Sequence, residues 1–88
     1  MADTSNLIRR EALRFLCERH ALPHALTAIT AGLRRAGVDT TQDLTTEALD
    51  YLTEKAWARR NPPAFGGGIA ASTWKATASG KDQNDESP

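Results

Sequence analysis

Apolar side chains recur with helical spacing in three segments between residues 5 and 55. The first segment places its apolar residues on one arc of a helical wheel, namely Ile8, Ala12, Leu13, Phe15 and Leu16. Ser5 or Asn6 can cap this helix, because a short side-chain oxygen accepts hydrogen bonds from free N–H groups of the first turn. We therefore predict a first helix that runs to about His20.

Two further helices are separated from the first, and from each other, by residues that end helices. Pro23 cannot continue a helix interior, and it leaves room for a short extended segment before the second helix. That helix is predicted from about Ala25 to Ala36, with Gly37 in the left-handed position that often follows a helix end. The third helix begins after a cap at Thr40 or Thr41 and runs to about Lys55. Its expected buried face consists of Leu44, Ala48, Leu49, Tyr51 and Leu52.

The pattern then changes to short extended segments joined by a loop. Residues 57–60 are predicted as a strand with Trp57 facing inward, and residues 72–77 as a returning strand with Trp74 and Ala76 on one face. Proline and a triple glycine between them predict a flexible loop. Residues 82–88 offer no apolar anchor, so we predict a disordered acidic tail there and a flexible N-terminus at residues 1–4.

Length and composition limit the class of protein. The chain has 88 residues, enough for one small domain, which we assign to residues 5–81. Its 11 basic and 11 acidic residues give zero net charge, without the basic excess of proteins that coat nucleic acid. A single cysteine cannot form an internal disulfide bond. Because neither a signal peptide nor a membrane-length apolar stretch is recognisable, we expect a cytoplasmic protein.

The order of these parts resembles that of a winged helix-turn-helix domain. The segments that carry the resemblance are Leu33-Arg34-Arg35-Ala36-Gly37, Leu44 through Tyr51-Leu52-Thr53-Glu54-Lys55, and Trp74-Lys75-Ala76-Thr77-Ala78-Ser79-Gly80. The chain is similar in this respect to MarR-like and PadR-like regulators, and more so to small stand-alone winged-helix proteins of Mu-like phages and prophages. The resemblance covers about residues 7–81. It implies an α+β domain of three helices and a β-hairpin wing.

The chain departs from the pattern of such domains at two positions. Ala56 stands where glycine often follows the third helix, and Ala76 stands where leucine often precedes the threonine of the closing strand. We recognise no dimerisation helix after the second strand, so we expect a monomer or a weak homodimer.

The resemblance implies that the domain binds double-stranded DNA and has a regulatory or accessory role. In this fold the third helix enters the major groove, and the wing follows the backbone or the minor groove. Cations can contact phosphates, and polar residues early in the third helix can reach base edges. The candidate DNA-binding residues are Arg34, Arg35, Thr41, Gln42, Thr45, Thr46, Arg59, Arg60 and Lys75. The other interpretation is that these are capping residues and ordinary surface residues.

The third helix also carries a feature that opposes DNA binding. Four carboxylates recur along one stripe at spacings of four, three and four, and like charges at close range to phosphates are costly. Three interpretations are open: only the N-terminal end of the helix enters the groove, the stripe binds a basic protein surface, or it is an ordinary solvated face. The alternative function is therefore a non-catalytic protein-interaction module that uses this stripe, two apolar loop residues, or both. Its candidate residues are Asp43, Glu47, Asp50, Glu54, Phe65 and Ile69.

We predict no catalytic residue, no metal site and no cofactor. His20 and His24 are four residues apart, but Pro23 breaks the helix that would align them as metal ligands. Cys17 lies near His20 in the sequence, yet both belong to a helix that packs the core. A half-buried structural thiol is therefore the better interpretation of Cys17. The Gly-rich loop lacks the following helix and the lysine of a phosphate-binding loop.

Overall fold

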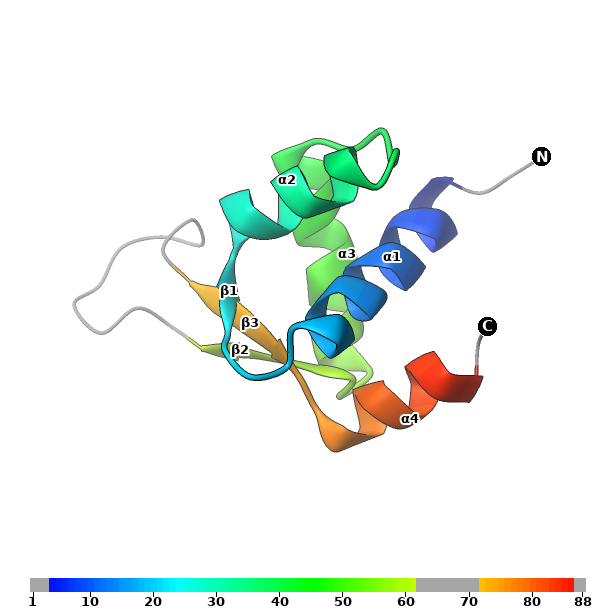
Figure 1. The fold of residues 1–88 in the computed structure, drawn as a ribbon, viewed down its shortest axis with the longest axis vertical. Coiled ribbons are helices and arrows are strands. Elements are labelled where there is room, and N and C mark those ends of the chain that lie inside the picture. The colour runs from blue at the N-terminus through cyan, green and yellow to red at the C-terminus, as the bar shows by residue number, and fades with distance from the viewer. Residues whose placement is uncertain (1–3, 62–71, 87–88) are drawn as a thin grey trace.

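The protein forms a small α+β domain in a computed structural model that describes residues 4–61 and 72–86. Its helices are α1 (Thr4–Glu18), α2 (Leu26–Arg35), α3 (Gln42–Glu54) and α4 (Ala78–Glu86). Its strands are β1 (His24–Ala25), β2 (Ala58–Asn61) and β3 (Thr73–Ala76) (Figure 1). None of the helices in the described part of the chain is long and apolar enough to cross a membrane.

Strand β3 lies in the middle of the sheet. The strand order is β1-β3-β2, and both pairings are antiparallel. Ala58 is opposite Ala76 and Arg60 is opposite Trp74, and directly opposed residues point to the same face of a sheet. Trp74 and Ala76 are buried, which confirms the prediction that they share the inward face of the closing strand.

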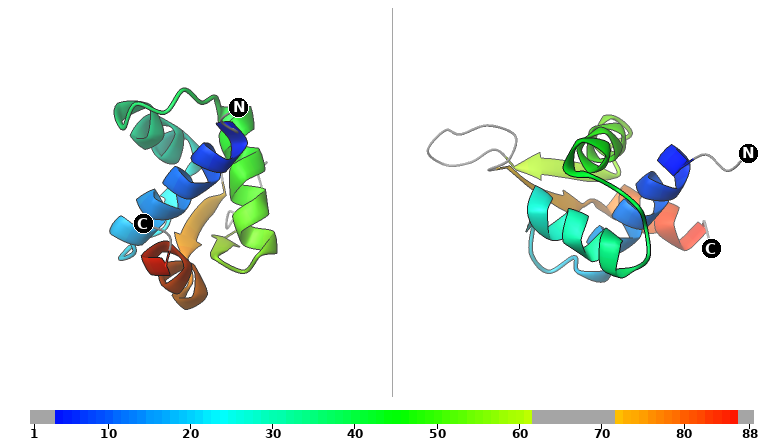
Figure 2. Two further views of the ribbon diagram at one scale, coloured as in Figure 1. Left: turned by 90° about the vertical axis from the view of Figure 1, so that its right-hand side faces the viewer. Right: turned by 90° about the horizontal axis from the view of Figure 1, so that it is seen from above.

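Helix α1 is the centre of the helical layer. It contacts α2, α3, α4 and β3, and Figure 2 shows it crossing between α2 and α3. Arg14 lies on its outer side, where Nε is 3.0 Å from Oε1 of Glu18, as the spacing of four residues predicts. The predicted apolar arc of α1 is buried in full, and it meets a buried set from α2 and α3, namely Leu26, Ile29, Leu33, Ala48, Leu49 and Leu52.

The buried face of α3 differs from the predicted one. Leu44, which we expected to be buried, has 39% of its surface exposed, and Tyr51 is only half-buried. Thr45 takes the inward position and is fully buried. Its hydroxyl donates to the Thr41 carbonyl oxygen at 2.8 Å and lies 3.1 Å from the Thr40 hydroxyl oxygen. These hydrogen bonds offset the cost of burying a polar side chain, so Thr45 rather than Leu44 occupies the buried position.

Helices α2 and α3 end with the same backbone geometry. The residue after each C-cap has a positive φ, 89° at Gly37 and 63° at Ala56. At the end of α3, the N–H of Trp57 donates to the carbonyl oxygen of Leu52 at 2.9 Å, which satisfies an otherwise free helix carbonyl. The prediction for Gly37 is confirmed, and Ala56 adopts a conformation that glycine favours.

Helix α4 is the main difference from the fold expected from the sequence. The sequence predicts three helices and a disordered tail from residue 82, whereas residues 78–86 form a fourth helix. The hydroxyl of Thr77 accepts the N–H of Gly80 at 3.0 Å and so caps the first turn. Gly80 is also the buried residue of α4, and it packs against the backbone of Trp57. Because a polar cap and a glycine contact hold this helix, no apolar periodicity reveals it.

Candidate nucleic-acid interface

The outer face of the sheet carries two opposed cations. Arg59 of β2 is directly opposite Lys75 of β3, and both side chains are exposed. Like charges at such positions are unfavourable, and neither side chain forms an ion pair with a residue that the structure describes. A hollow of about 490 Å³ lies beside them and is also lined by Pro23, Asn61 and Thr77. An anion bound between the two cations would relieve their repulsion.

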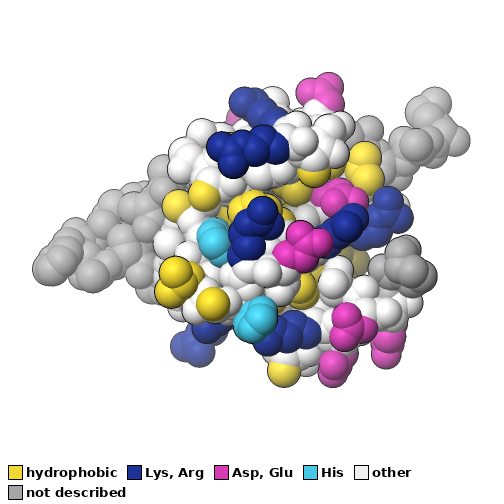
Figure 3. Space-filling view, in the orientation of Figure 1, with side chains coloured by type: hydrophobic (Ala, Val, Ile, Leu, Met, Phe, Trp, Pro, Cys, Tyr) yellow, Lys and Arg dark blue, Asp and Glu magenta, His cyan; other side chains and the backbone are white. Residues whose placement is uncertain are grey.

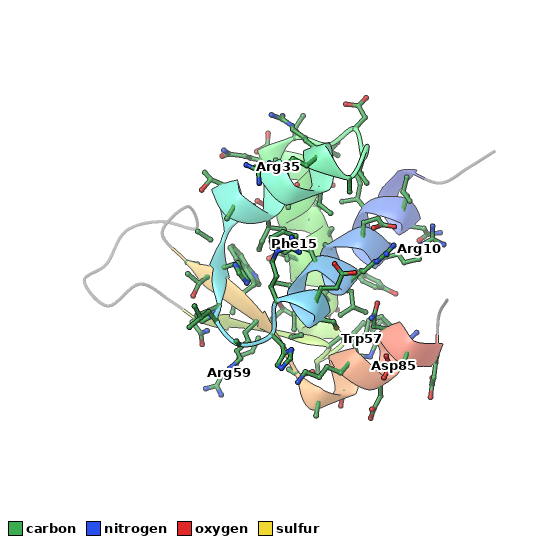
Figure 4. The ribbon with its side chains drawn as sticks, in the orientation of Figure 1. Arg10, Phe15, Arg35, Trp57, Arg59 and Asp85 are labelled. Carbon is green, nitrogen blue, oxygen red and sulfur yellow. The ribbon has the colours of Figure 1, made fainter. Side chains whose placement is uncertain are left out.

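Arg60 adds a third positive charge on the same strand pair but points to the other face. It is opposite the buried Trp74, and its Nε donates to the Ser72 hydroxyl at 3.0 Å. The residue is nevertheless exposed. In Figure 4 the side chain of Arg59 points away from the domain. The two neighbouring arginines therefore place positive charge on both sides of the sheet.

The two arginines at the end of α2 form a separate basic region. Both are exposed, and Nε of Arg34 donates to the Thr40 carbonyl oxygen at 2.9 Å, which turns this side chain toward the segment between α2 and α3. Arg35 borders a hollow of about 360 Å³ between α1 and α2. Figure 3 shows basic side chains gathered over α2, and Figure 4 shows Arg35 and Arg59 at different ends of the domain. The candidate cations therefore do not form one continuous patch.

The predicted polar contacts of the first turn of α3 are only partly available. Thr41 and Gln42 are exposed, and the Thr41 hydroxyl accepts the N–H of Leu44 at 3.2 Å as the helix cap. Thr46 is half-buried, and its hydroxyl donates to the Gln42 carbonyl oxygen at 2.8 Å. Thr45 is fully buried, so the prediction that it reaches a base edge or a phosphate is wrong. Its hydrogen bonds to the preceding loop hold it inside the core.

The four carboxylates of α3 are all exposed. The helix contains no basic residue, and none of its carboxylates forms an ion pair within the described ranges. It therefore presents a negative face without ion pairs to other described residues, formed by Asp43, Glu47, Asp50 and Glu54. Phe65 and Ile69, the apolar part of the alternative interface, lie outside the described residues.

The cysteine and the two histidines bond to backbone groups. The half-buried thiol of Cys17 donates to the carbonyl oxygen of Gly80 at 3.7 Å, which agrees with the interpretation as a structural thiol. Nδ1 of His20 is 3.3 Å from the carbonyl oxygen of Cys17 rather than from its sulfur. Nε2 of His24 is 3.0 Å from the carbonyl oxygen of Arg19. Residues 4–61 and 72–86 contain no group of three His, Cys, Asp or Glu that could hold a metal ion.

A further hollow, of about 270 Å³, lies between α1, α3 and α4, and sequence reasoning missed it. The rings of Tyr51 and Trp57 meet edge to face on its wall, with centroids 6.2 Å apart. Trp57 precedes β2 and so does not belong to the strand as predicted, but it is half-buried and packs against the hydrophobic core. The guanidinium carbon of Arg9 is 4.0 Å from the centre of the Tyr51 ring. The hollow depends on α4, which hydrophobic patterning does not predict.

The described surface thus offers four distinct regions: cations on the sheet, cations at the end of α2, carboxylates along α3, and an aromatic hollow beside α4. No family model matches the chain, and comparison with curated proteins and with solved structures likewise gives no match.

Proposed function

We propose that this domain binds double-stranded DNA as a winged helix-turn-helix module of regulatory or accessory type, like those of phages and prophages. The order of elements supports the proposal: a helix, a short strand, two helices and two strands, with the last strand central in the sheet. In such a module α2 and α3 are the helix-turn-helix pair, and the β2–β3 hairpin is the wing.

The observation that carries the proposal is the exposed pair of Arg59 and Lys75. Strands β2 and β3 together hold three basic side chains and no acidic one. Arg59 and Lys75 lie side by side on adjacent strands, and no described residue pairs with either charge. Their repulsion slightly lowers the stability of the domain without DNA. A DNA backbone supplies closely spaced negative charges, and each cation that neutralises a phosphate releases counterions. Phosphate binding therefore offsets an unfavourable interaction that is present without DNA.

The acidic stripe of α3 restricts how DNA would lie. Phosphates cannot approach the middle or the C-terminal end of this helix without strong repulsion from Glu47, Asp50 and Glu54. The first turn carries the exposed carboxylate of Asp43 as well, so only the N-terminal end of α3, at the exposed Thr41 and Gln42, can approach a base pair. We infer that contacts to the backbone dominate, so the preference for a particular DNA sequence is weak.

The experiment is a titration of labelled protein with random-sequence duplex DNA at low and at moderate salt. The double variant Arg59→Ala/Lys75→Ala should bind more weakly and reduce the salt slope by about 2, because two phosphate contacts are lost. Arg14→Ala is the control, since Arg14 is exposed but already paired with Glu18. If the double variant and Arg14→Ala both keep the affinity and slope of the unmodified protein, the wing model is wrong.

The negative face of α3 favours a second candidate function, a protein-interaction module with a basic partner. Reversing two of its charges in Asp50→Lys/Glu54→Lys should abolish capture of such a partner while the fold is kept. Both side chains are exposed and unpaired within the described ranges, so stability should change little. A partner that is retained by the charge-reversed protein would exclude the acidic stripe as its binding surface.

A further inference from the structure

We propose that the hollow between α1, α3 and α4, here called the aromatic pocket, is the docking site of a protein partner that inserts an aromatic side chain flanked by carboxylates. The pocket has walls of Tyr51 and Trp57 and a rim that includes Arg9 and Arg10. Figure 4 shows Arg10 and Arg59 on opposite sides of the domain, with Trp57 between them. The cationic rim of the pocket is therefore separate from the cations of the proposed DNA interface.

The interior of the pocket suits one aromatic ring. Leu13 and Leu52 line it together with the edge-to-face rings of Tyr51 and Trp57. Aromatic rings pair well in this geometry, and aromatic side chains in such pockets are frequent anchors of protein interfaces. A volume of about 270 Å³ lies just below the range of about 300–1,000 Å³ that is usual for drug-sized ligands, which favours a single inserted side chain.

The rim of the pocket selects for negative charge. The guanidinium carbon of Arg9 lies 4.0 Å from the centre of the Tyr51 ring, and Nζ of Lys55 lies 5.6 Å from the same centre. Arg10 is exposed and forms no ion pair with any described residue. The lining includes no aspartate or glutamate. Carboxylates on either side of an inserted ring would pair with these cations and fix its direction.

Helix α4 leaves the aromatic walls without an apolar partner. It contributes the amide-bearing residues Gln83 and Asn84 to the lining, and its buried residue is Gly80, which packs on backbone rather than in the pocket. Tyr51 and Trp57 are both half-buried, so part of the aromatic wall is accessible to a side chain from outside. The cations lie on the rim and the rings lie inside, so an occupant that uses both needs a ring and carboxylates that are spaced apart. An acidic peptide segment provides this spacing more readily than a compact small molecule does.

The test uses four probes and the isotope-labelled full chain, with the indole N–H of Trp57 as the reporter. The first probe is a capped peptide with one phenylalanine between two pairs of acidic residues. The second has alanine in place of phenylalanine, the third has Asn and Gln in place of the acids, and the fourth is phenylacetate. We expect saturable shifts at Trp57 with the first probe, and binding weaker by about tenfold or more with each of the others.

Matched variants separate the pocket from general surface charge. Arg10→Glu should reduce affinity for the acidic phenylalanine peptide by about tenfold, whereas Arg35→Glu, the same charge change on α2, should leave it unaltered. Thermal denaturation checks that both variants fold. The proposal is overturned if no probe binds, if the alanine peptide binds as well as the phenylalanine peptide, or if phenylacetate alone binds as tightly. Shifts at Trp57 that grow with protein concentration without peptide would assign the pocket to a second copy of this chain and also overturn it.

Discussion

Gly80 of α4 lies so close to the backbone of Trp57 that a side-chain carbon at position 80 would overlap the Trp57 carbonyl oxygen. The same oxygen accepts the N–H of Thr77 at 3.0 Å. These two contacts attach the start of α4 to the residue that precedes β2. The position of α4, and with it one wall of the aromatic pocket, therefore depends on the absence of a side chain at residue 80.

We predict that Gly80→Ala lowers the free energy of unfolding by about 1–3 kcal/mol, because the methyl group forces α4 away from Trp57. Helix propensity alone predicts the opposite, since alanine favours a helix over glycine by about 1 kcal/mol. Ser79→Ala, at the exposed neighbouring position, is the control and should be neutral or slightly stabilising. Urea denaturation measures whether Gly80→Ala lowers or raises the free energy of unfolding. If Gly80→Ala is as stable as the unmodified protein, this contact does not hold α4.

The elements that the sequence predicts correctly are those with a hydrophobic period. Helices α1 to α3 show apolar positions three and four residues apart because each buries one face against the others. Helix α4 buries a glycine instead and is capped by the half-buried Thr77, so its sequence has the polar composition of a disordered tail. A close backbone contact leaves little trace in hydropathy, and this is why α4 and the pocket beside it were not predicted.

In the candidate interface, the sequence likewise fails to predict the burial and the pairing of certain single residues. Thr45 was expected on the surface because threonine is polar, but its hydroxyl is satisfied by the Thr41 carbonyl in the folded chain. The opposition of Arg59 and Lys75 depends on the register of two strands separated by a loop, which composition does not specify. Charge placement along one helix, by contrast, follows directly from spacing, and the acidic stripe of α3 is exposed as expected.

Ala56 is a site where a substitution should increase stability. Its φ of 63° is strained for a residue with a side chain and relaxed for glycine. We expect Ala56→Gly to raise the free energy of unfolding by about 0.5–1 kcal/mol, after the greater freedom of glycine in the unfolded chain is deducted. Ala31→Gly, in the exposed middle of α2, should instead lose about 1 kcal/mol. Thermal melting of the two variants should shift in opposite directions, and a loss in both would contradict the left-handed conformation of Ala56.

Leu52 and Leu44 test the orientation of α3. Leu52 is 1% exposed, so Leu52→Ala should cost about 2–5 kcal/mol by leaving a cavity in the core. Leu44 is 39% exposed, so Leu44→Ala should cost less than about 1 kcal/mol. Chemical denaturation of both variants gives the comparison. Equal losses would mean that Leu44 belongs to the core and that the predicted buried face was correct.

Cys17 gives a prediction about pH. Burial raises the pKa of its thiol, and the negative charge of Asp85 raises it further, while Lys81 opposes the shift. The folded state thus disfavours the thiolate, so stability is unaffected at neutral pH and falls as pH rises above the usual thiol pKa of about 8.5. Alkylation by iodoacetamide at pH 8 should be slower than in the denatured chain. Asp85→Asn should lower the pKa and speed alkylation, and an unchanged rate would show that Asp85 does not act on Cys17.

Lys75→Glu should change stability and DNA binding in opposite directions. The substitution turns the repulsion with Arg59 into a cross-strand ion pair, which is worth about 0.2–1 kcal/mol of added stability. The same substitution removes one phosphate contact and neutralises the cation beside it, so binding to duplex DNA should weaken strongly at low salt. Lys81→Glu makes the same change of net charge on α4 and controls for long-range electrostatics. Denaturation midpoints and salt-dependent DNA titrations measure the two effects. If the variant gains stability but binds DNA as the unmodified protein does, the cross-strand repulsion is confirmed and the sheet is not part of the proposed interface. If the variant loses stability, the two cations do not repel each other in the folded protein.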